Sequence, residues 1–190
     1  MSHLVRLPPL DPAAMTEEQR AAAAALAAGP RGGVKGPFIA LLRSPELMQR
    51  LGDVGEYLRF RNTLDKRISE FLMLIVSREW TQQFEWAVHV PLALDAGVKR
   101  ETVASLATGR RPTEMAADEA IVYDFSVELL RNKGVSDATY GAALAQFGER
   151  GLIDLLGVLG YFSAVSMVLN VAHTPPPADP RVEPLAPLPL

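Results

Sequence analysis

The chain has no cysteine among its 190 residues, and it has only three histidines and two tryptophans. Without cysteine there is no disulfide, no thiolate metal ligand and no thiol redox step. No run of Lys and Arg is longer than two residues and the net charge is −3, so the basic stripe of a nucleic-acid-binding surface is missing. The sequence therefore leaves carboxylates, imidazole and other nitrogen and oxygen groups to carry any chemistry.

Long hydrophobic runs are also missing. The longest apolar stretches fall short of the roughly 18 residues that a membrane-spanning helix needs, and the N-terminus does not have the pattern of a secretory signal. We therefore expect a soluble, cytoplasmic protein that binds no membrane and no nucleic acid. The 48% hydrophobic composition is ample for the core of about one domain.

Apolar residues recur at helical spacing along most of the chain, and no credible strand pattern competes. The sequence predicts an all-α, single-domain bundle of seven or eight helices over residues 16–173. An N-terminal arm, residues 1–15, precedes it. A Pro-rich tail, residues 174–190, follows it and holds seven of the fifteen prolines. We expect this tail to be either an extended arm or disordered.

Capping residues, glycines and prolines set the expected helix boundaries. The expected helices are 16–28, 38–42, 45–60, one entered at Leu64–Asp65, 98–108, one opened by Pro112–Glu114 and closed at Asn132, 137–147 and 149–172. Two glycines in the last of these, Gly157 and Gly160, suit close packing between helices. Residues 31–37 contain three glycines without the spacing of a phosphate-binding loop, so we interpret them as a connector that could border a pocket.

The stretch from Glu70 to His89 contains both tryptophans and the only histidine away from the chain ends. Glu85 and His89 are four residues apart, so they share one helix face and can touch. A carboxylate beside an imidazole fixes its tautomer and raises its basicity, which is the minimum for acid–base catalysis near neutral pH. A surface ion pair explains the same spacing more simply, but apolar neighbours such as Phe84 and Trp86 favour a buried pair.

Glu70 can join this pair only if the helix breaks. In one straight helix, Glu70 would lie about 28 Å along the axis from the histidine. Ser77 and Thr81 are both candidate N-caps, and a break between them would fold two helices back on each other. The first turn of the second helix would then hold Gln82 and Glu85, with Glu70 facing it.

Several of these residues resemble a known superfamily. The pattern Leu64-Asp65-Lys66-Arg67, then Glu70, then Gln82-x-x-Glu85-x-x-x-His89 resembles the carboxymuconolactone decarboxylase / alkylhydroperoxidase D-like superfamily. Its peroxidase branch carries Glu, eleven residues, then Cys-x-x-Cys-x-x-x-His. Here Gln82 and Glu85 stand where the two cysteines would be, so the resemblance implies that peroxidase activity is lost and that the cysteine-free, decarboxylase-like branch fits better.

The resemblance implies an all-α fold, a homo-oligomer (a dimer, trimer or hexamer), a small-molecule substrate, and neither a cofactor nor a metal. It implies a lyase of the kind used in the catabolism of aromatic compounds. The implied reaction is decarboxylation or isomerisation of a small organic acid or lactone through a Glu/His relay. His89 would be the general acid or base, Glu85 would orient it and tune its charge, and Glu70 would be the second carboxylate.

Three further residues are candidate substrate contacts. Arg67 could bind a substrate carboxylate bidentately, Gln82 could donate to a substrate oxygen, and Trp86 could stack on the substrate. Arg67 is equally well explained as a helix-surface arginine, and Trp86 is better explained by core or subunit packing. Arg78 and Glu79 compete for the charged roles, although an ion pair between them at the break is the simpler account.

Two other functions stay open. Glu70, Glu85 and His89 are a possible ligand count for a metal site, although no second histidine accompanies them. The chain could also be a non-catalytic helical oligomer, or a small-molecule-binding member of the superfamily. Tyr57, Tyr123 and Tyr161 could each line a pocket, and their spacing selects none of them.

Overall fold

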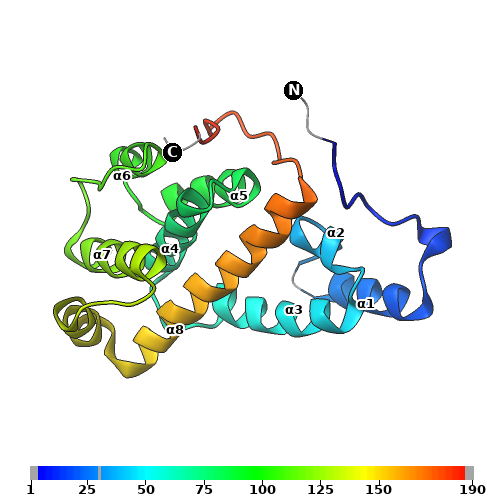
Figure 1. Ribbon diagram of the computed structural model, residues 1–190, viewed down its shortest axis with the longest axis horizontal. Helices are drawn as coiled ribbons and strands as arrows, with labels where there is room; N and C mark the ends of the chain where they lie inside the picture. Colours follow the sequence, from blue (N-terminus) through cyan, green and yellow to red (C-terminus); the bar gives the residue numbers. More distant parts are fainter. Residues whose placement is uncertain (1–3, 30, 187–190) are drawn as a thin grey trace.

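The computed structural model describes residues 4–29 and 31–186, and within them every regular element is helical (Figure 1). The elements are a short 3-10 helix η1 (Pro12–Ala14), α1 (Glu17–Ala28), α2 (Pro37–Leu41), α3 (Pro45–Phe60), α4 (Lys66–Glu79), α5 (Gln83–Asp95), α6 (Arg100–Ala107), α7 (Ala117–Asn132) and α8 (Asp137–Ala172). The all-α prediction is confirmed. The homo-oligomer and the division into a domain and two arms stay predictions.

The longest helix, α8, runs diagonally across the molecule (Figure 1), with α1, α2 and α3 near its C-terminal end and α6 and α7 towards its other end. It packs against α2, α3, α4 and α7. Gly148 interrupts it with φ 66° and ψ 175°, which is where the sequence predicts two helices to meet. By length and composition α8 could cross a membrane, but 56% of its most apolar 18 residues are buried, as in the core helix of a soluble protein.

Helix α4 lies at the centre of the core. It packs against α5, α7 and α8, and every residue from Ile68 to Arg78 is buried. Its apolar run, Phe71–Val76, is completely covered. Glu70 is also completely covered, so α4 carries a buried carboxylate that must find a partner.

The predicted break between α4 and α5 is present, but its capping residue differs from the prediction. Thr81 has φ 47°, in the left-handed region, whereas an N-cap normally takes extended backbone. Gln82 is extended instead, and its side chain accepts a hydrogen bond from Glu85 N at 2.8 Å. Ser77, the other candidate cap, lies inside α4 and donates to a carbonyl one turn earlier. Both predicted caps are therefore wrong.

Helix α7 also begins later than predicted. Its first residue is Ala117 rather than a residue in Pro112–Glu114. The N-cap position is Ala116, whose N–H donates to the Glu119 carboxylate at 2.8 Å. Because Glu119 reaches back to the backbone in this way, it fixes the helix start three residues downstream of the proline signal.

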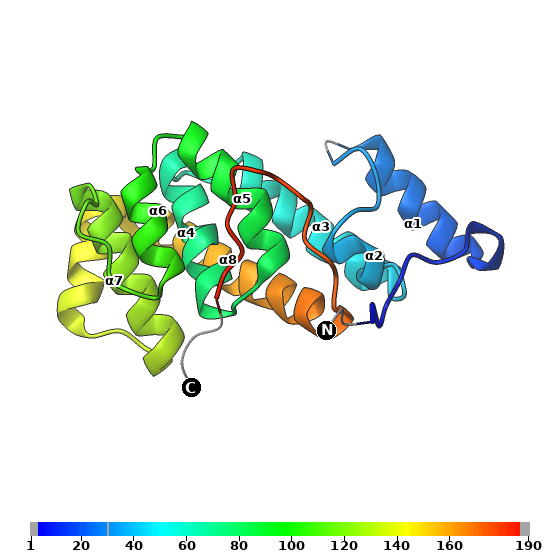
Figure 2. The ribbon, with the colours of Figure 1, turned by 90° about the horizontal axis from the view of Figure 1, so that it is seen from above.

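The described part of the Pro-rich tail is an extended arm that runs alongside α5 (Figure 2). Trp86 Nε1 donates to the Glu183 carbonyl at 3.1 Å. Gln83 and Leu185 exchange two hydrogen bonds of 2.7 and 2.9 Å, and Leu185 is only 4% exposed. The arm is therefore attached by side chains of α5, while residues 187–190 lie outside the described part.

The N-terminal arm, from residue 4 onwards, contacts two other parts of the chain. Arg6 N donates to the Ala172 carbonyl at 2.9 Å, at the end of α8. Arg43 donates to the Pro8 carbonyl at 2.7 Å. This arm has no regular element before η1, and its residues 1–3 lie outside the described part.

Gly157 and Gly160 provide a matched test of packing on α8. A Cβ on Gly157 would lie 2.9 Å from Leu58 Cδ2, whereas one on Gly160 would meet nothing within 4 Å among the described residues. We expect Gly160→Ala to raise the free energy of unfolding by about 0.5–1 kcal/mol through helix propensity. Gly157→Ala should be less stable than Gly160→Ala by about 1–3 kcal/mol because it overpacks the contact with α3.

Urea unfolding of the two variants measures this difference. Equal stability of the two variants would contradict the close contact between α8 and α3 at Gly157.

Candidate active site

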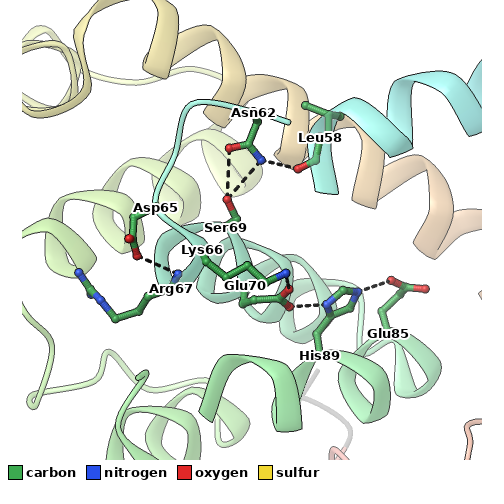
Figure 3. Close-up of polar contacts among 9 residues, drawn as sticks. All are labelled: Leu58, Asn62, Asp65, Lys66, Arg67, Ser69, Glu70, Glu85 and His89. Atoms are coloured by element: carbon green, nitrogen blue, oxygen red, sulfur yellow. Dashed lines mark hydrogen bonds and ion pairs between the residues drawn. The ribbon is translucent and has the colours of Figure 1, made fainter. Parts of the chain in front are cut away.

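The reversal between α4 and α5 brings a carboxylate and the central histidine into contact. Glu70 lies in the second turn of α4, and His89 lies midway along α5. Glu70 Oε2 is 2.6 Å from His89 Nδ1 (Figure 3). Glu70 is completely covered and His89 is 1% exposed, so this contact is made in the protein interior.

Two more charged side chains complete the group, which we call the Glu–His cluster (Lys66, Glu70, Glu85 and His89). Glu85 Oε2 is 3.3 Å from His89 Nε2, so the imidazole ring has a carboxylate at each nitrogen. Lys66 Nζ is 2.6 Å from Glu70 Oε1, and the lysine side chain is 53% exposed. The cluster therefore extends from a half-exposed ammonium through a buried carboxylate to the histidine and the second carboxylate (Figure 3).

Electrostatics favour the charged forms of the buried pair. Burial alone would lower the pKa of His89, but its hydrogen bonds to Glu70 and Glu85 outweigh burial and raise that pKa. Burial alone would raise the pKa of Glu70, but the hydrogen bonds from His89 and Lys66 outweigh it and lower that pKa. An imidazolium donates from both ring nitrogens, which matches a ring held between two carboxylates.

Glu85 and His89 line a cavity of about 400 Å³. This volume is within the range of small-molecule sites. The cavity is lined by four phenylalanines and three cations, and two of the cations lie over phenylalanine rings. These side chains are Phe38, Phe60, Phe84 and Phe162, and Arg31, Lys35 and Arg59.

The ring of Phe162 meets the imidazole of His89 edge-on, with centroids 5.3 Å apart and planes at 86°. This contact adds a packing constraint to the two hydrogen bonds that orient the histidine ring. A larger hollow of about 570 Å³ is lined mainly by α1 and α3. It does not include the Glu–His cluster, so the smaller cavity is the candidate active site.

The structure does not bring Arg67 to this cavity. Its guanidinium is 2.6 Å from Asp118 Oδ2 and 2.7 Å from Glu119 Oε1, and these carboxylates raise its pKa. In Figure 3 its side chain points away from Glu70 and His89. Arg67 thus ties α4 to the start of α7, which matches the structural explanation rather than the predicted carboxylate anchor.

Gln82 and Trp86 also lie outside the lining of the cavity. The Gln82 amide caps α5, and its nitrogen donates to Asn170 at 3.2 Å. Trp86 is 2% exposed, and its indole donates to the C-terminal arm. The packing explanation of Trp86 therefore agrees with its contacts, and neither side chain is placed to touch a ligand beside His89.

The two competing charged residues at the break do not pair with each other. Arg78 is 1% exposed and donates to the carbonyls of Ala107 and Ala186, at 3.0 and 2.8 Å, and to Thr81 Oγ1 at 2.9 Å. Glu79 pairs with Arg131 at 2.6 Å. Both side chains join the break to neighbouring segments.

The sequence analysis missed Lys66 as a member of the cluster, although its spacing of four residues from Glu70 is a usable signal. It also missed Arg31 and Arg59 as cavity residues. Arg31 lies in the glycine-containing connector, which does border the pocket. Tyr161, one of three tyrosines that the sequence could not separate, lines the cavity as well.

The carboxylates of the Glu–His cluster are not arranged like ligands of one metal ion. Glu70 contacts one ring nitrogen of His89 and Glu85 contacts the other, so the donors occupy opposite edges of the ring rather than converging on a shared point. Across the described ranges, no group of three His, Asp or Glu side chains has an arrangement suited to a metal.

Comparisons with known proteins agree with the resemblance noted in the sequence. The carboxymuconolactone decarboxylase family model matches residues 45–123, which include the whole Glu–His cluster. No curated protein matches the chain.

Two solved structures share the fold. One is the alkylhydroperoxidase AhpD core of an uncharacterized peroxidase-related protein from Ralstonia eutropha JMP134. Its TM-score is 0.74 at 16% identity, over 92% of this chain and 94% of that one. The other is an uncharacterized peroxidase-related protein from Silicibacter sp. TM1040. Its TM-score is 0.72 at 18% identity, over 90% of each chain.

The pKa shifts predict how stability depends on pH. Because the pKa of His89 is raised on folding, its contribution to the free energy of unfolding is full below about pH 6.5 and is lost as pH rises through the folded pKa. Because the pKa of Glu70 is lowered, its contribution is full above about pH 4.3 and is lost as pH falls through the folded pKa. We expect the contribution of the pair to be largest between these values.

Urea unfolding across this pH range measures the effect, with a His3→Gln/His173→Gln variant as the control. The control should keep the loss of stability above pH 6.5, since His89 is its only histidine. If the free energy of unfolding does not fall above pH 6.5, or if its fall disappears in the control, the assignment to His89 is contradicted.

Proposed function

We propose that this chain is a member of the carboxymuconolactone decarboxylase / alkylhydroperoxidase D-like superfamily and that it is an acid–base enzyme. It acts without a cofactor on a small organic acid or lactone, by decarboxylation or isomerisation. The observation that carries the proposal is the contact of His89 with both Glu70 and Glu85 at the wall of a small-molecule-sized cavity. An imidazole held in this way has one defined orientation and a raised pKa.

In a decarboxylation, the bond to the departing CO₂ breaks and its electron pair remains on the substrate as a carbanion or enolate. His89 Nε2, on the side of the ring that Glu85 shares with the cavity, donates a proton to that carbon. In an isomerisation the same nitrogen first removes a proton from one carbon and then returns it to another. Glu70 holds Nδ1 throughout, so the ring keeps its orientation as its charge changes.

Lys66 and Glu70 support this cycle from the opposite edge of the ring. The Glu70 carboxylate stabilises the imidazolium from the interior, and Lys66 keeps that carboxylate ionised. Because the lysine side chain is half-exposed, it also joins the buried carboxylate to solvent. We assign both residues to positioning His89 and setting its charge, since Glu85 and His89 are the members of the cluster that line the cavity.

The absence of cysteine limits the reactions that this chain can catalyse. The two structural neighbours carry peroxidase-related names, but Gln82 and Glu85 occupy the positions of the cysteine pair and the chain has no cysteine elsewhere. A thiol-dependent peroxidase step is therefore not open to it. The remaining reactive group in the matched segment is an imidazole between carboxylates, which is suited to proton transfer.

A non-catalytic binding protein is the second candidate. The observation that favours it is the 1% exposure of His89, because a histidine this buried can serve to stabilise the interior alone. Turnover that depends on His89 separates the two functions.

The test is turnover of a panel of small lactones and β-keto acids by the wild type and three variants. We expect His89→Gln and Glu85→Gln each to lower kcat by at least about 100-fold, the usual contribution of general acid–base catalysis. His173→Gln, at the end of α8, is the matched control and should leave kcat within about twofold. Turnover that survives His89→Gln would contradict the role of His89, and absence of turnover across the whole panel would support the binding function instead.

A further inference from the structure

The cavity beside the Glu–His cluster has an excess of positive side chains. Arg31, Lys35 and Arg59 line it, and among the described residues Glu85 is the one carboxylate in its lining. That carboxylate already contacts His89. Glu56, the carboxylate whose charge acts on Arg31, lies 3.5 Å from Arg61. The cavity therefore presents more positive charge than its own carboxylates neutralise.

Two of these cations have unused hydrogen-bonding capacity. Arg31 Nη2 and Arg59 Nε are buried, and neither makes a hydrogen bond of good geometry among the described residues, although Arg31 and the Tyr161 hydroxyl are close enough to interact as hydrogen-bond partners. The Arg31 guanidinium lies 4.5 Å from the centroid of the Phe38 ring. It therefore makes a cation–π contact with an aromatic ring rather than an ion pair with a carboxylate. Buried donors without a partner cost free energy, and an anionic ligand in the cavity would satisfy them.

Tyr161 adds a neutral donor beside Arg31. A Cβ on Gly55 of α3 would collide with both the Tyr161 hydroxyl and Arg31 Nη2, so the missing side chain at this position is what admits the two groups. Burial raises the pKa of Tyr161, and the charge of Arg31 only partly offsets this effect. The tyrosine therefore keeps its proton at neutral pH and can donate it in a hydrogen bond.

We propose that Arg31, Arg59 and Tyr161 form an anion subsite that binds the carboxylate of a small organic acid. The apolar body of the ligand lies among the phenylalanines, next to His89 and Glu85. This subsite deepens the proposed function, on which it rests, by fixing the substrate class as a carboxylate with a ring-sized apolar body. In this proposal the subsite binds the substrate carboxylate, which is the role that the sequence analysis gave to Arg67.

The subsite draws on parts of the chain beyond the segment that defines the family. Arg31 and Tyr161 lie outside residues 45–123, the range that the family model matches, while the Glu–His cluster lies within it. Arg31 comes from the connector before α2 and Tyr161 from α8. The proton-transfer group and the group that selects the substrate are therefore supplied by different parts of the chain.

The test is equilibrium binding of benzoate and of the uncharged, similarly shaped benzamide, measured by titration calorimetry at low ionic strength. We expect benzoate to bind the wild type at least about tenfold more tightly than benzamide. Arg31→Gln and Arg59→Gln should each weaken the binding of benzoate by about tenfold or more, because each variant loses a charge-assisted hydrogen bond. Both variants should bind benzamide within about twofold of wild type, which also shows that they fold.

Arg50→Gln is the matched control, because Arg50 is also on α3 but its side chain is 77% exposed and pairs with Glu46. It should leave benzoate binding within about twofold. Equal affinity of the wild type for benzoate and benzamide would overturn the subsite. An equal loss of benzoate affinity in Arg50→Gln and Arg59→Gln would overturn it too.

His89→Gln separates this inference from the proposed function. The preference for benzoate over benzamide should remain in this variant, because it depends on Arg31 and Arg59. Benzoate binding that requires Arg31 and Arg59 supports the subsite even if no turnover is found. His89-dependent turnover of uncharged lactones without selective benzoate binding would overturn the subsite and leave the acid–base function standing.

Discussion

The contact between Glu70 and His89 is the interaction on which the rest of the structure depends. Glu70 is the completely buried carboxylate of α4, and a buried charge without a partner costs several kcal/mol. Its ring partner is nineteen residues away, so the chain must reverse between α4 and α5. The left-handed backbone of Thr81 and the cap made by Gln82 produce that reversal.

The same contact explains how a core helix can carry reactive groups. Glu70 and Lys66 hold the inner edge of the imidazole, while the outer edge reaches Glu85 and the cavity. The resulting group is nearly neutral overall, with two cations and two carboxylates, so it is compatible with an apolar interior. The positive charge that remains in the cavity belongs to its arginines and Lys35. In the proposed function, these cations attract the anion, and the Glu–His cluster transfers the proton.

Short-range patterns in the sequence predicted the pair of Glu85 and His89, because residues four apart on a helix must meet. They also predicted a reversal near Thr81, although not which residue caps the second helix, because the left-handed backbone there is set by packing. Glu70 could be added through the predicted helix break, and the resemblance to a family then gave it a role. The all-α fold followed from helical periodicity, which is strong over most of the chain.

Contacts between segments that are distant in the chain could not be predicted from the sequence. Arg67 looked like a free anchor because its partners, Asp118 and Glu119, lie about fifty residues further on. Arg31 and Tyr161 are brought together by the packing of α2, α3 and α8, and no local pattern connects them. Gly55 makes room for these two side chains. In the sequence alone it looks like any other glycine in a helix, because its neighbours in space come from distant segments.

The central claim is that His89 is a buried imidazolium held between two carboxylates. The most direct measurement is ¹⁵N NMR of histidine-labelled His3→Gln/His173→Gln protein at pH 6.5, where His89 is the only imidazole. Because its pKa is raised above the usual value of about 6.5, both ring nitrogens should carry protons in more than half of the molecules. A spectrum dominated by one neutral tautomer at that pH would contradict the account.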